Sequence, residues 1–507
     1  MRRMTVDTVV VGAGSAGCVV AERLSRTERV ALLEAGPELV APGEDMMDGG
    51  RNAPLRYDWG LTHRVLSVPV TSPYPRGRLL GGSSMVNTCI ALRPSREDLA
   101  PWVERGLPMW SFDKLLPSFC AIESDREYGG EPYHGADGPL PVQRDPVEQW
   151  TPWAAGFVEA ARELGIPRCH DTNAPGAHGV GAHAFNRVDG RRVGAAPAWL
   201  RPEVRAREAL KVHTDCLVHR VRFEGRRAVG VEACDAEGDL LVYARRVVLC
   251  AGAIHTPGIL LRSGVGPSAE LHRLGVHRVA DVPGVGARLG DHPGTALFFL
   301  PVSGAAPAGA PLLQTVLRIP SEVSGHATDL QIQPGNSVPL PWTPTPLVSV
   351  MMHLGTPRAW GRLQFPSADV QARPHIDIAA WTHPDDVRRG IEVLEVAHAL
   401  AQTQPLRDLI QRPILPMRRG RRADLARHAL NWCDSGYHPC CTTPMGAAQD
   451  PMAVCDGWGR VRAVEGLHIV DAGLMPTVPA PNLHLLVLAM ADKLARHLAG
   501  QDSSSGS

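Results

Sequence analysis

The chain has 507 residues, 44% of them hydrophobic and 21% charged, a composition typical of a globular protein with large cores. Lys plus Arg and Asp plus Glu both number 52, so no net charge favours nucleic acid as a partner. The eleven cysteines lack the two-residue spacing of zinc or redox sites, and we expect reduced thiols, no metal site and a cytoplasmic protein. No run of about 18 apolar residues occurs, so no transmembrane helix is expected.

The first forty residues predict a βαβ unit. A short apolar strand, Val9–Val11, is followed by a helical stretch, Cys18–Leu24, and a second apolar strand, Val30–Leu33. Such apolar runs are typical of parallel strands that are covered on both faces. The turn between the first strand and the helix carries the glycines Gly12, Gly14 and Gly17.

This glycine pattern predicts a dinucleotide site. The first glycine permits a tight turn, the second lets the backbone approach a pyrophosphate, and the third lets helix and strand pack closely. Free N–H groups at the helix N-terminus favour phosphate binding. Glu34, at the end of the second strand, is placed to accept hydrogen bonds from ribose hydroxyls and would repel a 2′-phosphate. The local pattern does not separate FAD from NAD.

Other elements are predicted from apolar periodicity and turn residues. The sequence predicts helices over residues 150–165, 384–404 and 485–498, and strands over residues 241–249 and 464–470. Residues 300–345 are rich in Pro and Gly, and we expect loops over a site there. The Gly- and Ser-rich end, residues 500–507, is expected to be disordered.

Several later motifs resemble those of the glucose–methanol–choline (GMC) oxidoreductases. The segments Arg76–Asn87 and Ala251–Pro267 resemble the first and second family signatures. Further matches, in family order, are His134-Gly-Ala-Asp-Gly138-Pro139, Val282-Pro-Gly-Val-Gly286, Asp291-His292-Pro293, Tyr437-His438-Pro439, Asp471-Ala-Gly-Leu-Met475-Pro476 and Asn482-Leu-His484. The resemblance runs from residue 7 to about residue 498.

The resemblance implies FAD as the cofactor and assigns positions that hold it. The expected cofactor-binding residues are Gly12, Gly14, Ser15, Gly17, Glu34, Ala35, Arg78, Gly82, Ser83, Asn87, Val218, Ala251, Gly252, Asp471, Ala472 and Asn482. In some relatives a histidine just before the asparagine of the first signature bonds covalently to FAD. Val86 stands at that position here, so we expect non-covalent FAD.

The resemblance also implies a catalytic pair, His438 and His484. His438 matches the family's base, and His484 matches a second position that holds His or Asn. Alcohol oxidation removes a hydroxyl proton while a hydride leaves the carbon, and histidine, with an ordinary pKa of ~6.5, can receive that proton near neutrality. A second donor can hold the developing alkoxide. One departure is Cys441, where the family usually has glycine.

The expected reaction is oxidation of a small-molecule alcohol to an aldehyde or ketone, with oxygen or another acceptor reoxidising the flavin. Two alternatives stay open: an NAD-dependent dehydrogenase, and a flavin-binding relative with lyase or decarboxylase chemistry. The sequence indicates neither the alcohol nor an oligomeric state. Candidates to line the substrate pocket are Trp342, Met351, Met352 and His353.

The expected fold is α/β, with a Rossmann-like doubly wound FAD-binding domain interleaved with an α+β substrate domain on an antiparallel sheet. The motif order assigns residues 1–149, 206–294 and 438–498 to the FAD-binding domain, residues 150–205 and 295–437 to the substrate domain, and residues 499–507 to a disordered tail. We expect the active site where the two domains meet.

Overall fold

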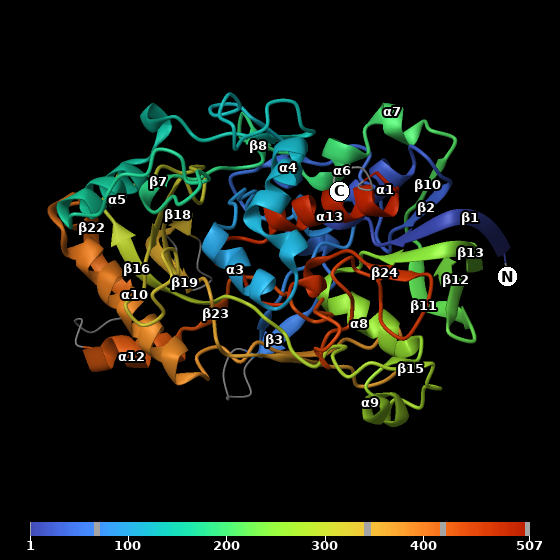
Figure 1. Ribbon diagram of the computed structural model, residues 1–507. Helices are drawn as coiled ribbons and strands as arrows, with labels where there is room; N and C mark the ends of the chain where they lie inside the picture. The colour runs from blue at the N-terminus through green and yellow to red at the C-terminus, as the bar shows by residue number, and fades with distance from the viewer. Residues whose placement is uncertain (1, 65–70, 339–345, 416–421, 502–507) are drawn as a thin grey trace.

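Two large sheets organise the chain (Figure 1). The computed structural model describes residues 2–64, 71–338, 346–415 and 422–501, so Trp342 and residues 502–507 of the predicted tail lie outside the described residues. The fold is α/β, a Rossmann-like sheet with helices together with a second, antiparallel sheet. None of the helices in the described ranges combines the length and hydrophobicity needed to cross a bilayer.

The first sheet is the doubly wound one. Its central strand, β1 (Arg2–Val11), runs parallel to β2 (Val30–Leu33) on one side and to β13 (Gly238–Leu249) on the other. The apolar end of β1 is buried because neighbouring strands and helices cover it. The sheet is completed by β10 (Leu210–His213) beside β2, β24 (Leu467–Ile469) beside β13, and the antiparallel strands β11 (Leu217–Glu224) and β12 (Arg227–Asp235).

Helices cover both faces of this sheet. Figure 1 shows α1 (Ser15–Leu24) and α13 (His484–Leu498) on one side and α8 (Gly252–Arg262) on the other. α1 packs against α13, which in turn packs against α4 (Phe112–Ile122). This arrangement brings the C-terminal helix beside the first glycine turn, although the two are far apart in the sequence.

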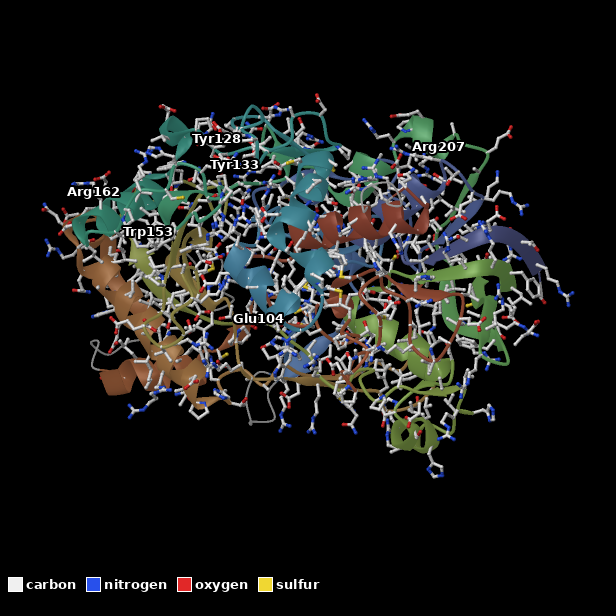
Figure 2. All side chains as sticks on the ribbon, in the orientation of Figure 1. Glu104, Tyr128, Tyr133, Trp153, Arg162 and Arg207 are labelled. Carbon is white, nitrogen blue, oxygen red and sulfur yellow. The ribbon has the colours of Figure 1, made fainter. Side chains whose placement is uncertain are left out.

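The second sheet has the strand order β22–β16–β19–β18–β17–β7, and all of these pairs are antiparallel. One face packs on α5 (Pro152–Glu163) and α10 (Pro384–Gln402). On α5, Trp153 (Figure 2) donates from Nε1 to the carbonyl oxygen of Ser349, at 3.1 Å. The strands are β7 (Gly179–Ala182), β16 (Pro293–Pro301), β17 (Thr315–Ile319), β18 (Leu330–Val338), β19 (Leu347–Leu354) and β22 (Ile410–Leu415), with β23 (Asp434–Ser435) paired to β16.

The described part of residues 300–345 differs from the expectation of loops, because it contains β17 and β18. Pro334 and Gly335 disguise β18 in the sequence, since proline lacks a backbone donor and glycine lacks a side chain to pack. In the structure Pro334 stands opposite Val350, and the register shifts only after Gly335. Pairing on both sides therefore holds a strand that its own residues do not favour.

The remaining elements are short. The remaining helices are α2 (Glu44–Met47), α3 (Arg96–Glu104), α6 (Ala195–Trp199), α7 (Pro202–Arg205), α9 (Ser268–Arg273), α11 (Gln404–Arg407) and α12 (Arg422–Asn431). The small sheets are β20 (Arg362–Gln364), β21 (His375–Asp377), β3 (Thr62–Arg64) and β4 (Thr71–Pro73); β5 (Glu123–Asp125) and β6 (Leu140–Val142); β8 (Arg187–Val188) and β9 (Arg191–Arg192); and β14 (Val265–Gly266) and β15 (Ala280–Asp281). The 3₁₀ turns are Leu55–Tyr57, Gly82–Met85, Pro108–Trp110, Val147–Gln149 and Ala472–Leu474.

Candidate functional site

A cavity of about 1370 Å³ is lined by residues of both sheets. It extends from the carboxyl ends of β1 and β2 to the face of the second sheet that α5 and α10 leave uncovered. Every residue that the sequence assigned to the cofactor or to catalysis lines this cavity, with the exception of Gly17. The lining also includes Met351, Met352 and His353, three of the candidate pocket residues.

Gly17 and Gly12 make the close packing of α1 on the sheet. A Cβ added at Gly17 would lie 1.8 Å from the carbonyl oxygen of Gly12. Gly12 itself has a φ of 94°, and a Cβ there would lie 2.7 Å from the carbonyl oxygen of Cys250. Neither position has room for a side chain, so both glycines shape the turn.

The backbone around Gly14 leaves room for a dinucleotide. Gly14 and Gly252 both line the cavity, and an added Cβ at either position would meet nothing within 4 Å. Gly14 is the N-cap of α1 and carries no side-chain cap, so the first N–H groups of the helix have no side-chain partner from the N-cap residue. Gly82 lies against the backbone of Gly14, where an added Cβ would lie 2.8 Å from the Gly14 Cα. This cradle fits a pyrophosphate.

Glu34 directly follows β2, at the same edge of the cavity. One carboxylate oxygen accepts a hydrogen bond from the Ala13 N–H at 2.9 Å, and the other accepts from the Gly36 N–H at 2.9 Å. Burial raises the pKa of Glu34 to about 7, and the backbone donors act against that shift. The carboxylate is therefore held rigidly at the position expected to bind a ribose.

Asp471 ties the C-terminal segment to the start of α8. Its carboxylate accepts hydrogen bonds from the Gly252 N–H at 3.0 Å, the Thr256 hydroxyl at 2.6 Å and the Gly473 N–H at 2.8 Å. Burial raises the pKa of Asp471 to about 6, and these hydrogen bonds act against that shift. These bonds keep Ala472, a lining residue, beside the glycine cradle.

His438 lines the cavity between the two large sheets. The carboxylate of Asp291 accepts a hydrogen bond from the His438 N–H at 2.9 Å, and Arg76 donates to the carbonyl oxygen of Tyr437 at 2.7 Å. Burial, followed by the nearby His292 and His353, lowers the pKa of His438 well below its ordinary value. The imidazole is therefore neutral near pH 7, the form that accepts a proton.

The two members of the expected catalytic pair have different hydrogen-bond partners. The side chain against His438 is Asn482, whose Nδ2 lies 3.0 Å from His438 Nε2. His484 instead shares a hydrogen bond between its Nδ1 and the Ser15 hydroxyl, at 3.1 Å. The Nε2 of His484 is buried without a hydrogen-bond partner. Asn482, which the resemblance assigns to the cofactor, therefore contacts the expected base, and His484 contacts Ser15 at the start of α1.

The second sheet supplies the opposite wall. Register places Gly294 opposite His353 and Ala296 opposite Met351, and all four line the cavity. Gln333 of β18 stands opposite Met351 and lines it too. Gly294 and Ala296, the two small residues of β16, therefore form part of this wall.

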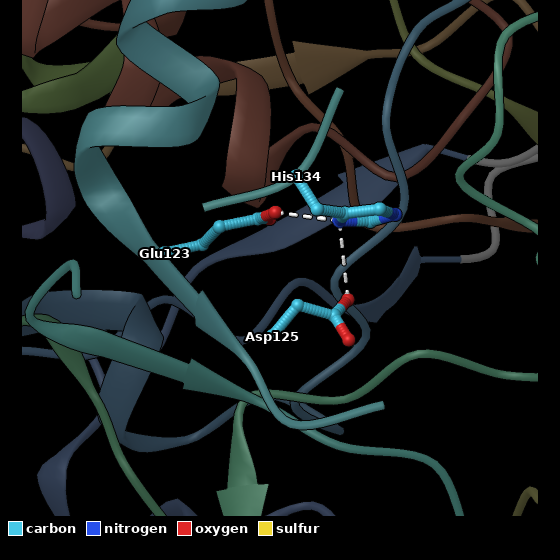
Figure 3. A group of neighbouring side chains, drawn as sticks. All are labelled: Glu123, Asp125 and His134. Carbon is cyan, nitrogen blue, oxygen red and sulfur yellow. Dashed lines mark hydrogen bonds and ion pairs between the residues drawn. The ribbon is translucent and has the colours of Figure 1, made fainter. Parts of the chain in front are cut away.

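A second cluster of titratable groups lies away from the cavity, at the segment His134–Pro139 (Figure 3). His134 Nδ1 lies 2.6 Å from Glu123 and 3.2 Å from Asp125, and its Nε2 lies 2.9 Å from Asp171. With carboxylates at both ring nitrogens, both must carry protons, and an imidazolium cannot bind a metal. Arg93 pairs with Glu123 and Arg144 with Asp125, so the cluster is a buried ion-pair network.

The doubly wound sheet, the dinucleotide cradle and the buried neutral histidine define a dinucleotide-dependent oxidoreductase. The chain belongs to the GMC oxidoreductase family: models of the N- and C-terminal parts, both described as GMC oxidoreductase, match residues 6–294 and 357–491. The family match favours FAD over the nicotinamide alternative that the glycine turn left open.

Curated relatives align over nearly the whole chain. The 5-(hydroxymethyl)furfural oxidase of Methylovorus sp. is 34% identical over 96% of this chain and 98% of its own length. Choline dehydrogenase, mitochondrial, of Homo sapiens is 33% identical over 97% of this chain and 89% of its own. Among solved structures, pyridoxine 4-oxidase from Mesorbium loti superimposes with a TM-score of 0.90 at 31% identity, covering 97% of this chain and 99% of that one.

Sequence reasoning did not anticipate the contact between Asn482 and His438, nor the residues behind His438. The family segment Asp291-His292-Pro293 was visible in the sequence, but nothing in it indicated that Asp291 and His292 contact His438, almost 150 positions later. Gln333 was hidden because β18 was not expected. The signal that could have found Asn482 is its place in the Asn482-Leu-His484 motif, two residues from the expected position.

Proposed function

We propose that the protein is an FAD-dependent oxidoreductase that oxidises a small-molecule alcohol to an aldehyde or ketone. His438 acts as the base and Asn482 as the second residue at the reacting oxygen. The observation that supports this is the contact of His438 Nε2 with Asn482 Nδ2, 3.0 Å apart, at the cavity between the two sheets. GMC oxidoreductases are FAD-dependent, and the cradle around Gly14 fits that cofactor.

The two side chains divide the work on the substrate hydroxyl. His438 Nε2 accepts the hydroxyl proton, since its lowered pKa keeps it neutral, and Asn482 Nδ2 donates a hydrogen bond to the oxygen as negative charge develops. Bound FAD supplies the acceptor for the hydride that leaves the same carbon. The hydroxyl oxygen loses the proton and its carbon loses the hydride, so the alcohol group becomes a carbonyl.

Several other residues hold the cofactor in this proposal. The backbone at Gly14 and Gly252 and the start of α1 border the pyrophosphate, and Glu34 binds a ribose. Ser15 and His484, which share a hydrogen bond, both line the cavity and border the cofactor. Binding is non-covalent because Val86 occupies the position at which some relatives attach FAD.

The relatives are named choline dehydrogenase, 5-(hydroxymethyl)furfural oxidase and pyridoxine 4-oxidase, and each of the three named compounds carries a primary alcohol. The test is therefore an anaerobic titration of the purified yellow protein with choline, 5-hydroxymethylfurfural, pyridoxine and benzyl alcohol. Bleaching of the flavin by one alcohol, and loss of that bleaching in His438→Gln with FAD retained, supports the proposal. Oxygen uptake after bleaching then distinguishes oxygen from another acceptor. A protein that binds no FAD, or whose flavin no alcohol reduces, contradicts it.

A further inference from the structure

His292 lies directly behind His438 and is fully buried. The Nδ1 atoms of the two imidazoles are 2.8 Å apart, and the rings meet edge to face with centroids 4.9 Å apart. The other nitrogen of His292, Nε2, lies 2.9 Å from the carbonyl oxygen of Pro479. Each contact is a hydrogen bond, so each must contain one proton, and the partners decide where that proton lies.

The carbonyl of Pro479 determines the tautomer of His292. A carbonyl oxygen accepts and never donates, so Nε2 of His292 carries the proton of that bond. Burial lowers the pKa of His292, and the ring therefore holds only this one proton. Its Nδ1 is left with a free lone pair, which accepts a hydrogen bond from Nδ1–H of His438.

The same logic then determines the tautomer of His438. With its one proton on Nδ1, the neutral ring has a lone pair on Nε2. Asn482 Nδ2, a donor, lies 3.0 Å from that atom. Gln331 of β18 lies on the far side of Asn482, with its Nε2 3.3 Å from Asn482 Oδ1, and so holds the amide with its nitrogen toward His438. All four hydrogen bonds agree in direction from Gln331 to Pro479.

We propose that His292 is the positioning residue of the active site, fixing His438 as the Nδ1–H tautomer so that Nε2 faces the cavity as the proton acceptor. The proposal rests on the proposed function, since it concerns the same base. Without an acceptor behind it, the neutral imidazole of His438 could place its proton on either nitrogen, and molecules protonated on Nε2 could not act as the base.

The acceptor behind His438 is held from several elements. The carboxylate of Asp98, in the first turn of α3, accepts a hydrogen bond from the Ala480 N–H at 2.7 Å, next to Pro479. The carbonyl oxygen of His292 accepts from the Gly436 N–H at 2.7 Å, two residues before His438. These two bonds hold the segments that carry Pro479 and His292, and a precisely oriented catalytic group requires such support.

Neutron diffraction from deuterium-exchanged crystals tests the proposal directly and needs no substrate. The expected result is deuterium on Nδ1 of His438 and on Nε2 of His292, with none on Nε2 of His438. Deuterium on Nε2 of His438 in the resting protein overturns the proposal. This measurement is independent of the proposed function: if no alcohol reduces the flavin, the positions of the deuterons still decide the tautomer.

Two substitutions test the consequence for the reaction. His292→Phe keeps a buried ring but removes the acceptor, and we expect flavin reduction to slow by roughly 10- to 100-fold, the scale of lost orienting partners of functional histidines, with FAD content and alcohol affinity unchanged. His292→Gln supplies a new carbonyl acceptor and should recover part of the rate. A reduction rate in a folded His292→Phe equal to that of the wild type overturns the proposal.

His428→Phe is the matched control. His428 is also buried, and its Nε2 also bonds a backbone carbonyl, that of Ala296, at 2.8 Å. It should lose stability to a similar degree while keeping the wild-type rate of flavin reduction. If His292→Phe fails to fold, His292→Gln and the neutron result remain as tests, because neither requires the loss of the buried polar side chain.

Discussion

Asn482 Nδ2 lies 3.0 Å from His438 Nε2, and this contact joins the start of the C-terminal helix to the loop that carries the base. Each side chain is supported from behind, Asn482 by Gln331 and His438 by His292. His484, only two residues from Asn482, is directed toward Ser15. Two residues of one short segment therefore contact different parts of the site: Asn482 contacts His438, and His484 contacts Ser15 beside the glycine turn.

Substitutions at the two positions should separate these purposes. We expect Asn482→Ala to slow flavin reduction by roughly 100- to 1000-fold, because one preorganised donor at the developing alkoxide is lost, and to leave FAD bound. His484→Ala should release FAD more readily and slow reduction less. Stopped-flow reduction together with FAD-to-protein ratios measures both effects. If His484→Ala shows the larger loss of rate with FAD intact, the original pair of histidines is the better assignment.

The pH dependence of the reaction follows from the environment of His438. Burial, with His292, His353 and Arg76 nearby, lowers its pKa well below 6.5. The working form is the neutral base, which is complete above the folded-state pKa and is lost only as the pH falls through it. We therefore expect kcat/KM to stay flat from neutral pH to below pH 6.5 and to fall at more acidic pH. A half-maximal point at or above pH 6.5 in a steady-state profile contradicts this.

The sequence predicted the parts of the fold that local patterns encode. The buried run Val9–Val11, the glycine turn and the strand Val30–Leu33 all lie where expected, because apolar periodicity and turn residues act locally. β18 was not expected, because Pro334 and Gly335 interrupt its pattern and only its two neighbouring strands stabilise it. Long-range pairing of this kind leaves no local trace.

In the site, too, local patterns were predictable and long-range contacts were not. Motif resemblance found the residues that line the cavity, but not which of them touch one another. The choice between Asn482 and His484 depends on how α13 begins, since residues two positions apart point in different directions there. His292 directly precedes β16 and Gln331 lies on β18, so the support that they give could not be inferred from any one segment.

The attachment of FAD follows from Val86, which lines the cavity. Valine has no nucleophilic atom, so the cofactor should be released when the protein is denatured. Acid precipitation should leave the yellow colour in the supernatant, with a spectrum matching free FAD. Colour retained in the pellet after washing would show a covalent bond elsewhere and contradict the prediction.

Cys441 should be strained, because its φ is 64°, in the left-handed region that glycine adopts freely. Its neighbour Cys440, equally buried, has no positive φ. Cys441→Gly should therefore be more stable than Cys441→Ala by about 1 kcal/mol. At position 440 the order should reverse, since glycine costs about 0.5–1 kcal/mol relative to alanine in ordinary backbone. Denaturant unfolding of the four variants gives both differences, and the same order at both positions contradicts the argument.

The ion-pair network around His134 predicts how stability changes with pH. Burial alone would lower the pKa of His134, but hydrogen bonds to Asp171 and Glu123 outweigh it and the net shift is upward. Burial alone would raise the pKa values of Glu123 and Asp171, but their cationic partners lower both. The stabilisation is therefore complete between roughly pH 4.5 and pH 6.5, lost above this window as His134 releases its proton, and lost below it as the carboxylates are protonated.

His134→Gln tests this account because it removes the titrating group and keeps a polar side chain. We expect it to lower the free energy of unfolding by about 3 kcal/mol near pH 6, since buried carboxylates lose a cationic partner. The difference from the wild type should shrink as the pH rises past 7, because the wild type loses its own imidazolium there. Arg162→Gln, which breaks an exposed pair with Glu159, is the control and should change the pH profile little. If the free energies of unfolding of His134→Gln and the wild type differ by the same amount from pH 5 to pH 9, His134 is neutral in the folded protein. One of its carboxylate partners would then have to be protonated to complete the hydrogen bonds.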